Sequence, residues 1–184
     1  MSLIKTYQKL LKNHFMVVQA VQTGLLMGVG DVVAQTLVEG KNLKKYQPVR
    51  TAKFMLLGTV FVGPSLSLWY RTLARKFGTQ SSSITTLKKV ACDQLIFAPS
   101  FLVVFVTNLN LMNGKSFSHI KKELEANYTD IVVANWKLWP AVQLVNFYLV
   151  PLNYQVLLVQ GVAIVWNTYL SWKTHTSHED IEIE

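Results

Sequence analysis

Residues 136–172 read WKLWPAVQLVNFYLVPLNYQVLLVQGVAIVWNTYLSW, and this stretch decides the fold class. After Lys137 it holds no charged residue. Its tryptophans and tyrosines are typical of the boundary between hydrocarbon and lipid headgroups. Its amides need partners within the protein, because an unsatisfied polar group in hydrocarbon costs several kcal/mol. The stretch therefore predicts a membrane helix with a polar inner face, interrupted at Pro140 and Pro151. The amides are Gln143, Asn146, Asn153, Gln155, Gln160 and Asn167.

The composition of the whole chain agrees with a membrane protein. Of its 184 residues, 51% are hydrophobic and 15% are charged, against about a quarter charged in soluble domains, and the mean hydropathy is +0.27. A soluble helical bundle is the alternative, but its helices would carry a charged outer face. We therefore expect an all-α membrane protein.

Four apolar stretches approach the ~20 residues that a span needs, at about 15–38, 53–71, 90–112 and 152–172. They predict a four-span helical bundle in which 15–172 form a single membrane domain, followed by a polar acidic tail at 173–184. Residues 136–151 fit either a kinked start of the fourth span or a separate short helix. We favour the short helix, because proline suits a helix start, where its missing N–H needs no partner.

Two amphipathic segments flank the spans. Residues 1–14 carry Lys5, Lys9 and Lys12, and no acidic residue precedes Asp31, a pattern that mitochondrial import recognises and that a plain helix before the first span also explains. Residues 116–128 predict a surface helix before the last span.

The net charge of +8 arises from lysines and arginines at the ends of the apolar runs. This distribution favours anionic lipids of the bilayer as partners, and we expect no direct binding of nucleic acid. Because every loop is basic, the charges do not choose an orientation in the membrane.

Polar residues within the spans are the candidate functional residues. A charge at the bilayer centre costs about 2.5–3.5 kcal/mol, so Asp31 and Asp93 should face a bundle interior or water. Gln35 and Gln94 accompany them, and Gln143 and Asn146 belong to the predicted last segment. These residues either line a pore or hold helices together by hydrogen bonds. For Asp93, near the start of the third predicted span, we favour an interfacial residue paired to Lys88 and Lys89.

Small residues and prolines predict close packing and kinks. Gly24 and Gly28 form a G-x-x-x-G motif that lets a second helix approach. Prolines within spans free backbone carbonyls that face a cavity, or kink a helix for packing. The predicted packing and kink residues are Gly24, Gly28, Gly63, Pro64, Pro99, Pro140 and Pro151.

Motifs of enzymes and metal sites are missing from the sequence. It has no H-E-x-x-H, C-x-x-C, phosphate-binding P-loop or G-x-S-x-G. The four histidines lie outside the predicted spans, and the single cysteine, Cys92, rules out an internal disulfide. We expect no enzyme activity, no metal and no cofactor.

Several motifs together resemble the Mpv-seventeen and peroxisomal membrane protein family along nearly the whole chain. They are W-x-x-W-P-x-x-Q-x-x-N-F-x-x-V-P and W-N-x-Y-L-S-W near the C-terminus, G-D-x-x-x-Q from Gly30, V-G-P from Val62, and D-Q-x-x-F-A-P from Asp93. The C-terminal run is most similar to the mitochondrial inner-membrane branch, with the peroxisomal membrane as the alternative. One departure is Gln155, where the family often has arginine.

The resemblance implies a small channel that supports mitochondrial homeostasis, including membrane potential, reactive oxygen species and mitochondrial DNA maintenance. We therefore expect a gated, weakly selective channel for small hydrophilic solutes or ions in the mitochondrial inner membrane. Gating is required, because moving one charge across 100 mV is worth about 2.3 kcal/mol and an open pore would dissipate that energy. An alternating-access carrier and a structural scaffold remain alternatives, and a homo-oligomer stays open.

Overall fold

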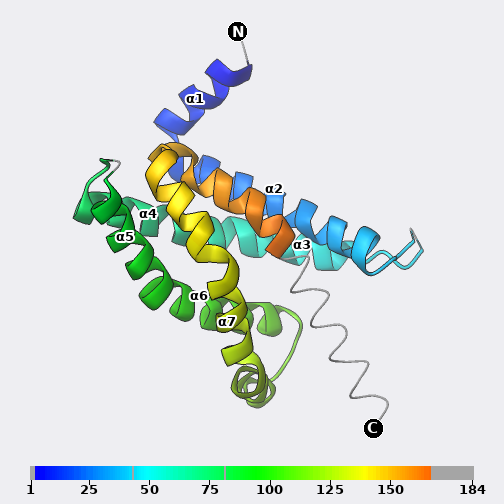
Figure 1. Cartoon of the computed structure of the whole chain (residues 1–184). Coiled ribbons are helices and arrows are strands. Elements are labelled where there is room, and N and C mark those ends of the chain that lie inside the picture. The colour runs from blue at the N-terminus through cyan, green and yellow to red at the C-terminus, as the bar shows by residue number, and fades with distance from the viewer. Residues whose placement is uncertain (1–2, 43, 81, 167–184) are drawn as a thin grey trace.

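The computed structural model describes residues 3–42, 44–80 and 82–166, and that part of the chain is helical with short connections and no strand. Figure 1 shows the helices in chain order. The first half holds α1 (Leu3–Asn13), α2 (Phe15–Val33), η1 (Ala34–Val38), α3 (Pro48–Leu57), η2 (Gly58–Val62) and α4 (Gly63–Phe77). The second half holds α5 (Ser83–Cys92), η3 (Asp93–Phe97), α6 (Ala98–Met112), α7 (Phe117–Leu149) and the helix Leu152–Trp166.

Three of the described helices are long and apolar enough to cross a membrane: Phe15–Leu37, Pro48–Phe77 and Ser83–Met112. Leu152–Trp166 is apolar but shorter. The remainder of the predicted fourth span, 167–172, and the tail at 173–184 lie outside the described residues. The all-helical class is thus confirmed with three candidate spans, and the fourth span stays a prediction.

The predicted interruptions at Gly63–Pro64 and Pro99 are wide turns through which the helices continue. The backbone N–H of Gly63 donates to the carbonyl of Gly58, and that of Ala98 donates to the carbonyl of Asp93. Both bonds reach five residues back, as in a π-helix. Pro64 and Pro99 follow directly, and a proline lacks the N–H that an α-helix needs. The wide turn therefore stands where the regular bonding pattern is broken.

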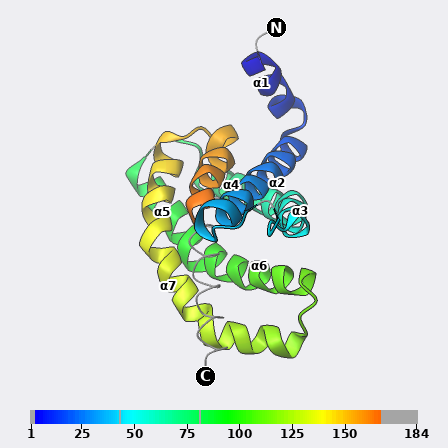
Figure 2. The ribbon, with the colours of Figure 1, turned by 90° about the vertical axis from the view of Figure 1, so that its right-hand side faces the viewer.

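The predicted short helix beginning near Pro140 is wrong. Residues 136–149 form the second half of α7, a helix of 33 residues with Pro140 inside it. One missing hydrogen bond is tolerated, because buried side chains hold α7 on both sides of the proline, among them Ile120, Trp139 and Phe147. The segment predicted as a surface helix is the first part of the same helix, and Figure 2 shows that part running beside α6 before α7 changes direction. Its position at a membrane surface stays a prediction.

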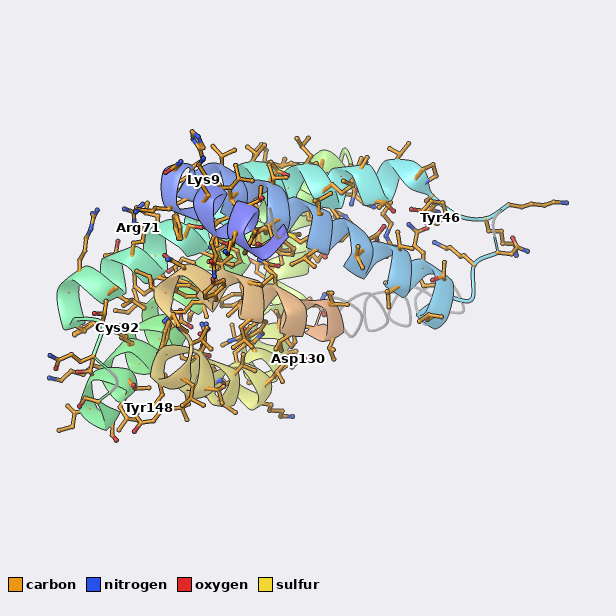
Figure 3. All side chains as sticks on the ribbon, turned by 90° about the horizontal axis from the view of Figure 1, so that it is seen from above. Lys9, Tyr46, Arg71, Cys92, Asp130 and Tyr148 are labelled. Atoms are coloured by element: carbon orange, nitrogen blue, oxygen red, sulfur yellow. The ribbon has the colours of Figure 1, made fainter. Side chains whose placement is uncertain are left out.

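The molecule has two ends, which are defined by its connections. At one end, where the connection at 39–47 leads into α3, the first turns of α3 lie near the connection at 113–116, because Lys53 Nζ donates to Asn113 Oδ1 at 3.0 Å. At the other end Ser83 and Leu87 meet Tyr148 and Leu149 in one groove. Figure 3 shows Tyr46 at the first end, with Arg71 and Tyr148 toward the second.

Glycines bring α2 close to α3 and η2. A Cβ added to Gly58 would lie 2.8 Å from the Cα of Gly24, and one added to Gly63 would lie 2.8 Å from the Cα of Ala20. A Cβ on Gly28 would meet the side chain of Met55. The predicted G-x-x-x-G face therefore lies against other helices of the same chain.

Candidate functional site: a polar cavity between the helices

The bundle contains two separate groups of polar side chains, of which the first centres on Asp31. Its Oδ1 lies 2.8 Å from Nε of Arg50, at the start of α3. Its Oδ2 accepts hydrogen bonds from Thr51 Oγ1 at 2.6 Å and from Gln35 Nε2 at 2.8 Å. Asp31 is 3% exposed, so this buried carboxylate has a cation and two hydrogen-bond donors as partners.

The Asp31 group also fixes the connection at 39–47. Gln35 Oε1 accepts from the backbone N–H of Gln47 at 2.8 Å, and its Nε2 donates to the carbonyl of the same residue at 3.1 Å. Glu39 pairs with Arg50 at 2.8 Å and with Lys41 at 2.6 Å. This arrangement joins α2 and η1 to α3, so it acts chemically as a clamp between helices.

The second group surrounds a cavity of about 90 Å³ in the middle of the molecule. Residues from α2, the second and third candidate spans, α7 and the helix Leu152–Trp166 line it. Its polar lining consists of Tyr70, Asp93, Gln94, Asn135, Gln143 and Gln160. Its apolar lining includes Met27, Leu66, Phe97, Leu102, Phe105, Trp139, Val159 and Trp166.

Asp93 is the acidic residue of the cavity lining. Its Oδ1 accepts from Trp69 Nε1 at 2.8 Å, and its Oδ2 accepts from Gln94 Nε2 at 2.8 Å. The Oε1 of Gln94 in turn accepts from Asn135 Nδ2 at 3.1 Å. Asp93 is 2% exposed, and Trp69 and Gln94 are both neutral.

A second chain of hydrogen bonds crosses to α4. Asn146 Nδ2 donates to Gln143 Oε1 at 2.9 Å, and Gln143 Nε2 donates to the Tyr70 hydroxyl at 2.8 Å. Asn146 is fully buried and stands behind Gln143 rather than in the lining. Asn135, Trp139, Gln143 and Asn146 follow one another at helical spacing along α7 and therefore share a face.

Aromatic rings form much of the remaining wall. Phe97 stacks on Trp69 at 4.9 Å and on Phe101 at 5.1 Å between ring centroids. Trp139 and Trp166 meet edge to face at 6.3 Å. Both tryptophans are buried in the protein, so they pack against other helices, and their depth in the membrane stays a prediction.

The structure separates the residues that the sequence grouped as pore candidates. Asp93, Gln94 and Gln143 line the cavity and Asn146 supports it, whereas Asp31 and Gln35 belong to the clamp. Sequence reasoning missed Tyr70 and Asn135 as lining residues, and it placed Gln160 on a polar inner face without counting it among the pore candidates. The spacing of polar and tryptophan residues from 135 to 146 was a usable signal, but only with 117–149 recognised as one helix.

Within the described residues, no three His, Cys, Asp or Glu side chains gather to hold a metal ion. The cavity can offer a carboxylate, amide groups and aromatic faces to a bound polar group.

The sequence of the chain is similar to those of known proteins. A family model described as Mpv17 / PMP22 family matches residues 110–171. Mitochondrial inner membrane protein Mpv17 of Homo sapiens is 45% identical over 175 residues, covering 95% of this chain and 99% of the relative. The protein of the same name from Mus musculus is 46% identical over 176 residues, covering 95% and 99%. Protein sym-1 of Neurospora crassa is 38% identical over 171 residues, covering 92% and 98%. No solved structure matches the chain.

Proposed function

This chain belongs to the Mpv17 / PMP22 family and is a mitochondrial inner membrane protein, and from that premise we propose that it is a gated, weakly selective channel for small hydrophilic solutes or ions. The observation that carries the proposal is the cavity, where Asp93, Gln94, Asn135, Gln143 and Gln160 converge inside the bundle. Amides and a carboxylate at membrane depth are costly unless they serve a polar path or each other.

The outer surface of the same helices supports a location within lipid. Val60, Leu95 and Ile96 are 68%, 67% and 59% exposed. The helices are thus apolar outside and polar within, the reverse of a soluble bundle. This distribution fits a polar pathway enclosed by spans.

Met27 is the residue that we assign to the gate. It lines the cavity, is 3% exposed, and precedes Asp31 by one helical turn on the same face of α2. It therefore stands between the cavity and the clamp at the 39–47 end. An apolar side chain at such a constriction excludes water and closes a pore by dewetting. A closed resting state is what the inner membrane requires.

An alternating-access carrier is the second candidate, and a repeated construction favours it. The second candidate span consists of elements of 10, 5 and 15 residues, and the third consists of the same three lengths in the same order. Pro64 and Pro99 stand at the same place in the two series. Paired interruptions in related segments are a feature of carriers that bind substrate near the membrane centre.

The deciding experiment is electrical recording and solute flux with purified protein in planar bilayers and vesicles. We expect discrete conductance steps for the wild type and a higher open probability for Met27→Ser, because a hydroxyl wets the constriction. Met16→Ser is the matched control, since Met16 is 36% exposed on the same helix.

The alternative results would each point to a different function. Saturable counterflow without conductance steps would favour the carrier. Neither steps nor flux from folded protein would rule out transport and leave a scaffold. Equal open probability for Met27→Ser and the wild type would remove Met27 from the gate while leaving the channel.

A further inference from the structure

Gln160 is a buried glutamine in the cavity lining, and its side-chain amide makes no hydrogen bond to the described residues. It is 3% exposed and belongs to the cavity lining. The described part of the chain gives its amide no hydrogen-bond partner, whereas Gln94 and Gln143 both bond to neighbours. Buried polar groups are nearly always paired, and leaving one unpaired is costly. The position of Gln160 therefore points to a ligand in the cavity.

The charged residues of the lining indicate the sign of the ligand's charge. Asp93 is the only acidic side chain in the described lining, which contains no lysine, arginine or histidine. Lys89, one turn earlier on the same helix, forms no ion pair with Asp93 among the described residues and is not part of the lining. A buried carboxylate without a counter-charge is unfavourable, and a cationic ligand would supply one.

The acceptors around the cavity fit a primary ammonium group. A carboxylate has about four acceptor sites, so Asp93 can accept a further bond beside those from Trp69, Gln94 and Gln143. Asn135 uses its Nδ2 to donate to Gln94, which leaves its carbonyl oxygen available. Gln160 adds a third acceptor, and an ammonium group has three N–H donors.

The apolar wall and the volume specify the rest of the ligand. Leu66, Leu102 and Val159 face the cavity together with Trp139 and Trp166. Aliphatic walls favour an alkyl chain, and indole faces attract cations. A cavity of about 150 Å³ holds benzene, so about 90 Å³ has room for about four heavy atoms. Inorganic cations would leave the apolar wall without a contact.

We infer that this cavity binds a small primary alkylammonium ion, with the ammonium group held by Asp93, Asn135 and Gln160 and the alkyl chain against the leucines and tryptophans. This inference rests on the proposed function, because it names a solute class for the same cavity. It concerns binding, which is measured without a membrane potential and separately from conductance.

The test is calorimetric titration of the full-length protein in detergent with propylammonium chloride. We expect saturable binding at one site per chain. At matched ionic strength, 1-propanol, propionate and potassium chloride should not compete, and tetraethylammonium should be too large. Asp93→Asn and Gln160→Leu should each weaken binding by about tenfold or more, as expected for a lost hydrogen bond to a charged ligand.

A matched control separates binding from folding. Gln19→Leu replaces a fully buried glutamine that is outside the cavity lining, and its affinity should equal that of the wild type. Gln160→Leu should unfold no earlier than the wild type without ligand, because it removes an unbonded amide. Weaker binding by a variant that remains folded is then specific to the ligand.

Four outcomes would overturn the inference. They are no saturable binding by folded wild type, equal binding of potassium and propylammonium ions, unchanged affinity in Gln160→Leu, and equal loss of affinity in Gln19→Leu. Conductance without propylammonium binding would leave the channel proposal standing. Binding without conductance or flux would support the site and overturn the channel.

Discussion

Asp31 shows how a charge within a membrane helix is accommodated by its neighbours. From the sequence it fitted either a pore wall or a link between helices. The structure surrounds it with Arg50, Thr51 and Gln35 and places it outside the cavity lining. Its partners come from α3 and from the next turn of its own helix. The contacts therefore favour a stabilising role over a conducting one.

Asp31→Asn is expected to lower stability and leave ion preference unchanged. The amide loses the ion pair with Arg50 and one acceptor for Thr51, so the free energy of unfolding should fall by about 1–3 kcal/mol. Thermal unfolding in detergent and the reversal potential under a salt gradient measure the two effects. Glu125→Gln is the control, because Glu125 is exposed and its contact with Lys121 is 3.7 Å. A change in ion preference at unchanged stability would contradict this assignment.

Gln155 is the residue that departs from the family resemblance, and its contacts give it a structural role. Its Nε2 donates to the carbonyl of Val150 at 3.0 Å and to that of Asn146 at 3.4 Å. The carbonyl of Asn146 also accepts from the backbone N–H of Val150, whereas the carbonyl of Val150 lies just beyond the end of α7, where a helix leaves its last carbonyls without backbone donors. The side chain therefore caps α7 from the following helix.

Gln155→Leu should lower the free energy of unfolding by about 1–2 kcal/mol, because the carbonyl of Val150 loses its side-chain donor. Gln155→Arg should retain most of the stability, since a guanidinium group offers more donors and a cation is favourable at a helix C-terminus. Unfolding temperatures of both variants in the same detergent check this pair. If arginine destabilised as much as leucine, capping would not explain the position.

At the level of elements, glycine determines how closely α2 approaches its neighbours. Gly58 faces the backbone of Gly24, and backbone cannot move aside as a flexible side chain does. Gly161 in the helix Leu152–Trp166 has open space around it instead. The two positions therefore form a natural pair for comparison.

Gly58→Ala should destabilise the bundle by about 1–3 kcal/mol, because the added methyl group forces the two helices apart. Gly161→Ala should be neutral or stabilise by roughly 0.5–1 kcal/mol, because alanine favours a helix and nothing obstructs it. Thermal unfolding of the two variants measures the difference. Equal stability of both variants would mean that α2 and η2 are not in close contact in solution.

Some elements could be predicted from the sequence because their signal is local. Apolar length located the first span almost at its observed bounds, whereas the second and third helices extend five to seven residues beyond the ends predicted at 53, 71 and 90. Asp93 was singled out from the sequence, but the favoured interfacial position beside Lys88 and Lys89 was wrong, because the structure buries it in the cavity lining. The continuity of α7 could not be predicted, because whether Pro140 starts or interrupts a helix depends on packing along its whole length. The burial of Trp139 and Trp166 in the cavity wall could not be predicted for a similar reason, since a tryptophan near a helix end suits a lipid boundary and a protein interior equally well.

At the scale of the whole molecule, the clamp and the polar cavity lie at different positions between its two ends. The clamp around Asp31 holds the 39–47 end, the cavity lies in the interior, and the connection at 78–82 marks the opposite end. In addition, α3 packs on α6 and α4 packs on α5, so the second and third candidate spans run in opposite directions. A channel and a carrier use this arrangement differently, because only a carrier must open the two ends in turn.

Distances between spin labels at the two ends distinguish these motions. We would place one pair at Lys44 and Lys115 and the other at Gln80 and Leu149, all exposed, after replacing Cys92 with serine. For a channel gated by Met27 we expect neither distance distribution to shift when propylammonium is added, because wetting a constriction needs no movement of whole helices. A carrier instead requires one pair to separate while the other closes. Opposite shifts of the two distances would therefore reject the channel. They would also indicate that the wide turns at Gly58–Val62 and Asp93–Phe97 act as hinges. The same labels in Met27→Ser provide the control, since that variant should conduct more without any change in either distance.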